Sequence, residues 1–215
     1  MTERMLKTIG ERYPLKPVDA GEFAALKMNG MKFTVRAYDA AGLGRVSVLL
    51  AHGMFGLMRM DTLIINPAQR DLPLFSYDRV YAMGNDTLIL ELYGTTASPF
   101  SCAELDRLYE ESRALPERER RGACWYDGIR LPQSLSKKGR RAMTPAFDRI
   151  TEKYLEAWLD AGFPEPFDMD EKRRKTEAYV GGLLKNGGPS TDVFRKNLGD
   201  ERTAALFRNV LFGTA

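Results

Sequence analysis

The chain has 215 residues, is 44% hydrophobic and carries a formal net charge of only +3. This length can bury one large core, so we expect a single domain over residues 1–215. No run of 18 apolar residues is present, so we expect no membrane span. The N-terminal stretch is charged and lacks the apolar region of a secretory signal, so we do not expect it to be one. Two cysteines, Cys102 and Cys124, make no disulfide framework, which favours a cytoplasmic protein.

The histidine content limits the possible metal chemistry. His52 is the only histidine of the chain, so a histidine-based metal cluster is excluded and we expect no metal site. The glycine-rich motifs that bind nucleotide phosphates are also absent.

The first half of the chain predicts strands. Residues 31–38 alternate apolar and polar side chains, and further strands are expected at 45–52, 57–66, 74–83 and 86–93. Short turns that contain glycine separate them, a pattern typical of an antiparallel meander.

Beyond Pro99 the apolar spacing becomes helical. A helix is expected over 101–115 with a Ser101–Glu104 capping box, and another over 144–162 with Thr144 as its N-cap. Residues 170–184 and 199–212 are expected to be helical too. Strands followed by helices predict an α+β fold, with the C-terminal helices packed on the sheet.

The strand expected at 74–83 carries a carboxylate at its centre. Its alternation places Ser76, Asp78 and Val80 on one face. A hairpin at Gly84-Asn85 with a two- or four-residue loop puts Asp78 directly opposite Glu91, whereas a three- or five-residue loop separates the two acids. Opposed carboxylates away from water share a proton near neutral pH, so the pair could act as a proton donor. The alternative is an acid on a solvated strand face.

Two segments resemble the ferredoxin-dependent bilin reductases. The first is NPAQRDLPLFSYDRVYAMGNDTLILELYG, residues 66–94, which matches a family pattern at Pro67, Asp71, Leu72, Pro73, Phe75, Asp78 and Glu91. The second is KNGGPSTDVFRKNLGDERTAALFRNVLFG, residues 185–213, which is similar to the closing region of that family.

The resemblance implies a three-layer α/β/α sandwich with a central antiparallel sheet. It implies that a linear tetrapyrrole (a bilin such as biliverdin) binds between the sheet and the C-terminal helices, with no bound metal or flavin. Reduced ferredoxin or flavodoxin would supply electrons, and side chains would supply protons. Carried over, Asp78 is the central proton donor and Glu91 its acidic partner, and the substrate-binding candidates are Thr62, Ser76, Val80 and Asn186.

The propionates of a bilin call for cations at the mouth of its pocket. The candidates are Arg70, Arg130, Lys185 and Arg195, and their spacing does not decide among them.

The sequence departs from the family pattern at two places. A histidine that several members carry falls at Thr62, or at Asp61 if the loop is counted differently, and no aspartate follows Asn186. Two functions therefore remain open. One is an oxidoreductase acting on a bilin, and the other is a non-catalytic protein that binds a tetrapyrrole or another flat ligand.

A basic stretch lies between Pro116 and Met143, with eight basic residues against three acidic ones: Arg118, Arg120, Arg121, Arg130, Lys137, Lys138, Arg140 and Arg141. Ferredoxins are acidic, so we expect Lys137, Lys138, Arg140 and Arg141 to dock the electron donor, although such a run can also be an ordinary solvated surface. Nucleic acid is a poorer partner, because the net charge is low and no known nucleic-acid module is present. We expect a monomer.

Overall fold

The computed structural model describes residues 1–53, 56–119 and 122–214. Within these ranges, eight strands form one antiparallel sheet in the order β1-β3-β4-β5-β6-β7-β8, and β2 pairs with the other half of β3. The strands are β1 (Leu15–Val18), β2 (Ala25–Met28), β3 (Met31–Ala40), β4 (Gly44–Gly53), β5 (Met58–Asn66), β6 (Leu74–Ala82), β7 (Asn85–Tyr93) and β8 (Leu135–Arg140). The expected meander from β3 to β7 is confirmed.

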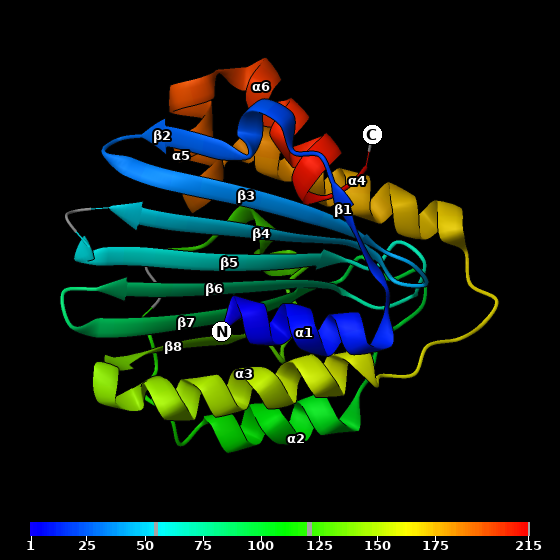
Figure 1. Cartoon of the computed structure of the whole chain (residues 1–215). Coiled ribbons are helices and arrows are strands. Elements are labelled where there is room, and N and C mark those ends of the chain that lie inside the picture. The colour runs from blue at the N-terminus through cyan, green and yellow to red at the C-terminus, as the bar shows by residue number, and fades with distance from the viewer. Residues whose placement is uncertain (54–55, 120–121, 215) are drawn as a thin grey trace.

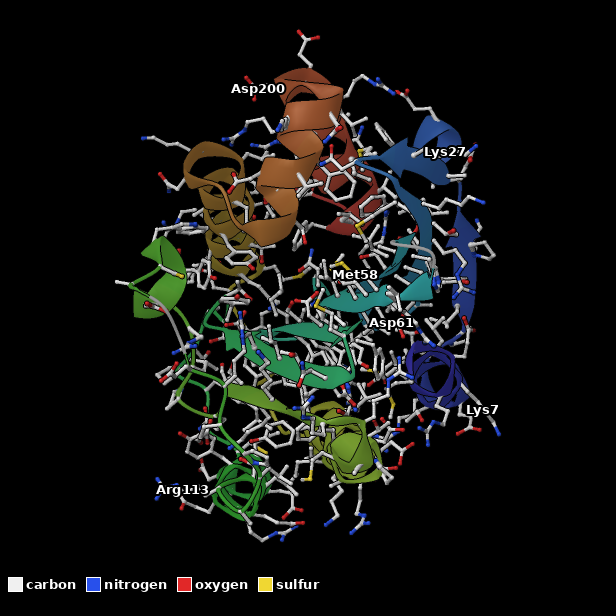
Figure 2. The ribbon with its side chains drawn as sticks, turned by 90° about the vertical axis from the view of Figure 1, so that its left-hand side faces the viewer. Lys7, Lys27, Met58, Asp61, Arg113 and Asp200 are labelled. Atoms are coloured by element: carbon white, nitrogen blue, oxygen red, sulfur yellow. The ribbon has the colours of Figure 1, made fainter. Side chains whose placement is uncertain are left out.

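Helices cover both faces of this sheet (Figure 1). One layer contains α1 (Thr2–Arg12), α2 (Ala103–Ser112) and α3 (Thr144–Leu159), and the other contains α4 (Met169–Asn186), α5 (Pro189–Leu198), α6 (Asp200–Ala205) and a π-helical turn at Leu206–Leu211. In Figure 2, Asp200 marks the second layer and Arg113 the first, with Met58 and Asp61 of β5 between them. The expected α+β fold, an α/β/α sandwich, is confirmed.

A core lies on each side of the sheet because each strand alternates its side chains between the two faces. Phe75 and Tyr77 of β6 are buried under α3, whereas Leu74 is buried with Tyr179 and Phe194 of the C-terminal helices. None of the helices in the described residues is long and apolar enough to cross a membrane.

Two expected helix starts are wrong. Helix α2 begins at Ala103, and its N-cap Cys102 makes no side-chain cap, so the Ser101–Glu104 capping box does not form. Helix α3 begins at Thr144 itself. The hydroxyl of Thr144 donates to Asp86 at 2.5 Å instead, and Asp86 forms a fully buried ion pair with Arg79 of β6.

Several described elements have no counterpart among the sequence predictions, and they include α1, β1, β2 and β8. Strand β8 has the sequence LSKKGR, which lacks an apolar alternation, and it forms by pairing with β7 from Asn85↔Arg140 to Leu90↔Leu135. Long-range pairing therefore creates this edge strand where local sequence gives no signal.

Candidate active site

The β6–β7 hairpin sets the geometry of the two candidate acids. Its turn is Met83-Gly84, with φ of 49° and 76°, so Ala82 pairs with Asn85 and the turn lies one residue earlier than expected. Asp78 therefore pairs with Ile89, and Glu91 pairs with Ser76. The predicted direct opposition is wrong, but the two acids still share one face as diagonal neighbours.

Asp78 and Glu91 line a cavity of about 400 Å³ between the sheet and the C-terminal helices. The sheet side of the cavity also carries Ser76 and Val80, as the alternation predicted, and Thr62, which the resemblance suggested. The helix side is largely apolar and includes Tyr179, Leu183, Phe194, Phe207, Leu211 and Phe212. A polar strip on a rigid sheet thus faces a mostly apolar roof.

Three successive residues fix the entry into β6. The carboxylate of Asp71 accepts hydrogen bonds from the backbone N–H groups of Ala97 and Ser98, at 2.6 and 2.9 Å. The carbonyl of Leu72 accepts from Lys172 Nζ at 2.7 Å, and the carbonyl of Pro73 accepts from the Trp158 indole at 3.0 Å. Both helix layers therefore hold the segment that leads to Asp78.

The roof of the cavity is tied to the sheet at its C-terminal end. The Ser47 hydroxyl donates to the carbonyl of Leu211 at 2.9 Å, and the Asn66 amide donates to that of Phe212 at 2.7 Å. Arg45 donates to the carbonyls of Asn209 and Val210. These side chains satisfy carbonyls that a helix end leaves unpaired, so the end of the roof has a fixed position over the sheet.

Asp78 has surroundings that favour its protonated form. It is half-buried, and the hydroxyl of Thr62 on the neighbouring strand donates to its Oδ1. Burial raises the pKa of Asp78 to about 6, and the charge of Glu91 acts in the same direction, whereas the Thr62 hydrogen bond and Arg118 oppose the rise. The carboxyl group is therefore partly protonated close to neutral pH.

Glu91 has different partners. Its Oε2 accepts a hydrogen bond from the Tyr93 hydroxyl at 2.6 Å, and its Oε1 lies 3.6 Å from a guanidinium nitrogen of Arg130. Arg130 is also 4.0 Å from Asp127. The two acids on the cavity floor thus differ in charge environment, since only Glu91 has an arginine within ion-pair distance among the described residues.

Of the two positions considered for the missing histidine, Thr62 lies in the cavity lining and Asp61 does not. Thr62 pairs with Asp78 and lines the cavity. Asp61 points to the opposite face, where it is fully buried and forms an ion pair with Arg59. His52 is exposed on β4 and pairs with Lys32 and Arg59, away from the cavity lining.

Four of the candidates for binding the ligand lie outside the cavity lining. Arg70 packs over the rings of Tyr13 and Phe163 and donates to the carbonyl of Gly42. Asn186 and Lys185 are exposed at the end of α4, and Arg195 bonds the carbonyl of Leu184 and pairs with Asp200. None of these four belongs to the cavity lining.

Arg118 is a lining residue that the sequence reading did not place in the pocket. It is exposed, and its backbone N–H donates to the carbonyl of Ser136 on β8, which brings it to the cavity. The only signal for Arg118 in the sequence was its place in the basic stretch. No group of three metal-ligating His, Cys, Asp or Glu side chains occurs in residues 1–53, 56–119 and 122–214.

Of the four residues expected to dock the electron donor, three are exposed. Lys138, Arg140 and Arg141 are exposed at β8 and just after it. Lys137 is only 2% exposed and pairs with Glu117, so the expectation that it docks a partner is corrected, because alternation turns it toward the helix-covered face. Arg120 and Arg121 lie outside the described residues.

Comparison with known proteins adds a relationship of fold. No protein-family model and no curated protein sequence matches this chain. The structure is similar to the crystal structure of phytochromobilin synthase from tomato in complex with biliverdin, with a TM-score of 0.76 and 13% sequence identity over 99% of this chain and 82% of that chain. At this identity the likeness shows that the two chains share a fold.

Proposed function

We propose that this protein reduces a bilin in the cavity over β6, with electrons from ferredoxin and with Asp78 as proton donor. The observation that carries the proposal is the carboxyl group of Asp78, which lies in a cavity with a pKa raised to about 6. This is the residue that the resemblance assigns to proton donation. The shared fold with phytochromobilin synthase, crystallised with biliverdin, supports a linear tetrapyrrole as ligand.

The cavity suits a flat ligand that is polar along one edge. Its volume of about 400 Å³ falls within the usual range for small-molecule sites. The oxygens of Thr62, Asp78 and Glu91 can accept hydrogen bonds from pyrrole N–H groups, while the apolar roof packs on the face of the ring system. Exposed Arg118 offers a guanidinium to a propionate, with Arg130 nearby beside Glu91.

The chemistry then follows from the storage of a proton next to the ligand. Two reduced ferredoxins each lose one electron, and the bilin gains two electrons and two protons. The first electron makes a radical whose charge is neutralised when the neutral Asp78 carboxyl transfers its proton to the tetrapyrrole. Asp78 becomes a carboxylate and takes up a proton again before it can serve a second time.

Visible spectroscopy tests this proposal. Biliverdin mixed with the protein should change its absorption on binding, and reduced ferredoxin should cause a further change. Asp78→Asn keeps the shape of the side chain and removes the proton, so it should bind biliverdin and stall as a long-lived radical visible by electron spin resonance. Loss of a general acid costs about a hundred- to ten-thousand-fold in rate. Turnover of Asp78→Asn within a few-fold of the parent would show that Asp78 is not the donor.

A second candidate function is binding without reduction. Thr62 stands at the cavity position where the resemblance leads us to expect a histidine, and a threonine hydroxyl does not titrate near neutral pH. A spectral shift on mixing, followed by no change with reduced ferredoxin, would favour this function.

A further inference from the structure

We propose that Arg130 and Tyr93 are positioning residues that hold the carboxylate of Glu91 in a fixed place near Asp78, so that the proton of the acid pair stays on Asp78. This inference rests on the proposed function only for its catalytic meaning. The arrangement itself is a property of the ligand-free protein.

Backbone pairing places Arg130 next to Glu91. After the excursion through α2, the chain returns beside the end of β7, where the N–H of Gly94 donates to the carbonyl of Ile129 at 2.7 Å. The N–H of Leu131 donates to the carbonyl of Leu92 at 2.7 Å, and Arg130 forms a bridge with Tyr93 between these bonds. Main-chain hydrogen bonds of the two residues that flank Arg130 therefore hold its guanidinium beside Glu91.

Tyr93 holds the other oxygen of Glu91. Its hydroxyl donates to Oε2, and its ring, 3% exposed, packs against the rings of Tyr126 and Tyr179. A ring packed on two sides has little freedom to move its hydroxyl away. Glu91 is thus held through one oxygen by a neutral donor and through the other by a cation.

Asp78 has a weaker set of partners. The neutral hydroxyl of Thr62 donates to it, and the cation that acts on it, Arg118, is exposed to solvent. Two acids on one floor with unequal partners do not share a proton equally, because the acid beside the arginine is stabilised as the anion. The titratable and charged groups around the pair are Tyr93, Arg118, Cys124, Tyr126, Asp127, Arg130 and Tyr179.

A charged Glu91 has a definite use in a proton-delivering site. It raises the proton affinity of its neighbour, and it favours the return of a proton to Asp78 after each transfer. Without Arg130, the proton would be shared between the two carboxyl groups, and Asp78 would no longer be the single proton donor.

Carboxyl ¹³C NMR of the ligand-free protein tests the inference directly. Asp78→Asn and Glu91→Gln assign the two signals, and the parent should show Asp78 as the carboxyl group that takes up the proton. Arg130→Gln should move the titration of the pair to higher pH, since it removes the cation that lies 3.6 Å from Glu91. Arg130→Lys keeps the charge and should restore the parent titration.

Tyr93→Phe is the second variant, and it should shift the pair in the same direction by a smaller amount, because it removes a neutral donor. Unchanged titration in both Arg130→Gln and Tyr93→Phe would overturn the inference, as would a parent in which Glu91 carries the proton. The experiment uses no bilin and no ferredoxin, so failure of biliverdin to bind would count against the proposed function alone.

Discussion

Thr62 and Asp78 face each other across the β5–β6 pair, and the threonine hydroxyl donates to Oδ1 of the aspartate. This hydrogen bond stabilises the charged carboxylate, while burial stabilises the neutral acid. The pKa of about 6 reflects the balance between the two, with burial the larger effect. The hydroxyl therefore adjusts how readily the candidate donor holds its proton.

Thr62→Val should raise the pKa of Asp78 above about 6, because it removes a donor that favours the charged form. A hydrogen bond to a charged group contributes about 1.5–3 kcal/mol, so a rise of about one unit or more is expected. The pH dependence of bilin reduction should extend to higher pH by the same amount. Thr62→Ser keeps the hydroxyl and is the matched control, and an identical titration of valine and serine variants would contradict the prediction.

Asp78→Asn should stabilise the protein near neutral pH. The pKa of Asp78 is raised from 3.8 to about 6 in the folded state, so folding is favoured by this group below about pH 4 and loses that contribution as the pH rises through about 6. Asparagine avoids the loss, so the variant should gain up to about 3 kcal/mol in free energy of unfolding at pH 7.5 and little at pH 4. Urea unfolding at both pH values measures the difference, with exposed Glu177→Gln as the control.

Charge reversal on the exposed basic edge should weaken docking of the electron donor and leave binding of the ligand unchanged. Lys138, Arg140 and Arg141 changed together to Glu should slow ferredoxin-driven turnover steeply at low salt and less at high salt, where charges are screened. Biliverdin binding should stay at the parent level.

Lys16, Lys27 and Lys32 are exposed at the opposite edge of the sheet, on β1, β2 and β3. Their change to Glu alters the net charge equally and is the matched control. Equal slowing of both triple variants would show a general charge effect and not a docking surface.

Two adjacent glycines of α4 should respond in opposite ways to alanine. A Cβ on Gly181 meets open space, whereas a Cβ on Gly182 would lie 2.4 Å from ring atoms of Trp125, whose indole donates to the carbonyl of Gly187. Gly181→Ala should raise stability by about 0.5–1 kcal/mol, since glycine is unfavourable within a helix. Gly182→Ala should lower the melting temperature and shift tryptophan fluorescence, and a stabilising Gly182→Ala would disprove this packing.

The side on which Asp78 lies could be predicted from sequence because alternation is a geometric property of any strand. The pairing could not, since the turn uses Met83 at φ 49°, and methionine gives no signal for this conformation, whereas Gly84-Asn85 gives a strong one. A shift of the turn by one residue moves the partner by two positions and keeps the face. The cavity floor was therefore predicted correctly even though the exact partner was not.

The contact between Arg130 and Glu91 could not be predicted from the sequence for another reason. Arg130 is 39 residues away along the chain, and it reaches Glu91 only because residues 129–131 pair with the end of β7. Strand β8 likewise depends on its pairing with β7. Because Lys137 lies on the face of β8 that the helices cover, its side chain is buried. Such contacts are set by the tertiary structure, which local pattern does not encode.

Asp78 and Arg79 are adjacent in sequence, but their side chains lie on opposite faces of the sheet. Arg79 is fully buried on the face away from the cavity, where it pairs with Asp86. Insertion of a single residue early in β6 would exchange Asp78 and Arg79, placing a guanidinium over the cavity and an unpaired carboxylate in the core. The loss of a buried partner alone costs about 3–5 kcal/mol, comparable to the whole stability of many domains. The Arg79–Asp86 ion pair thus fixes the register of β6, and with it the side of the sheet on which Asp78 lies.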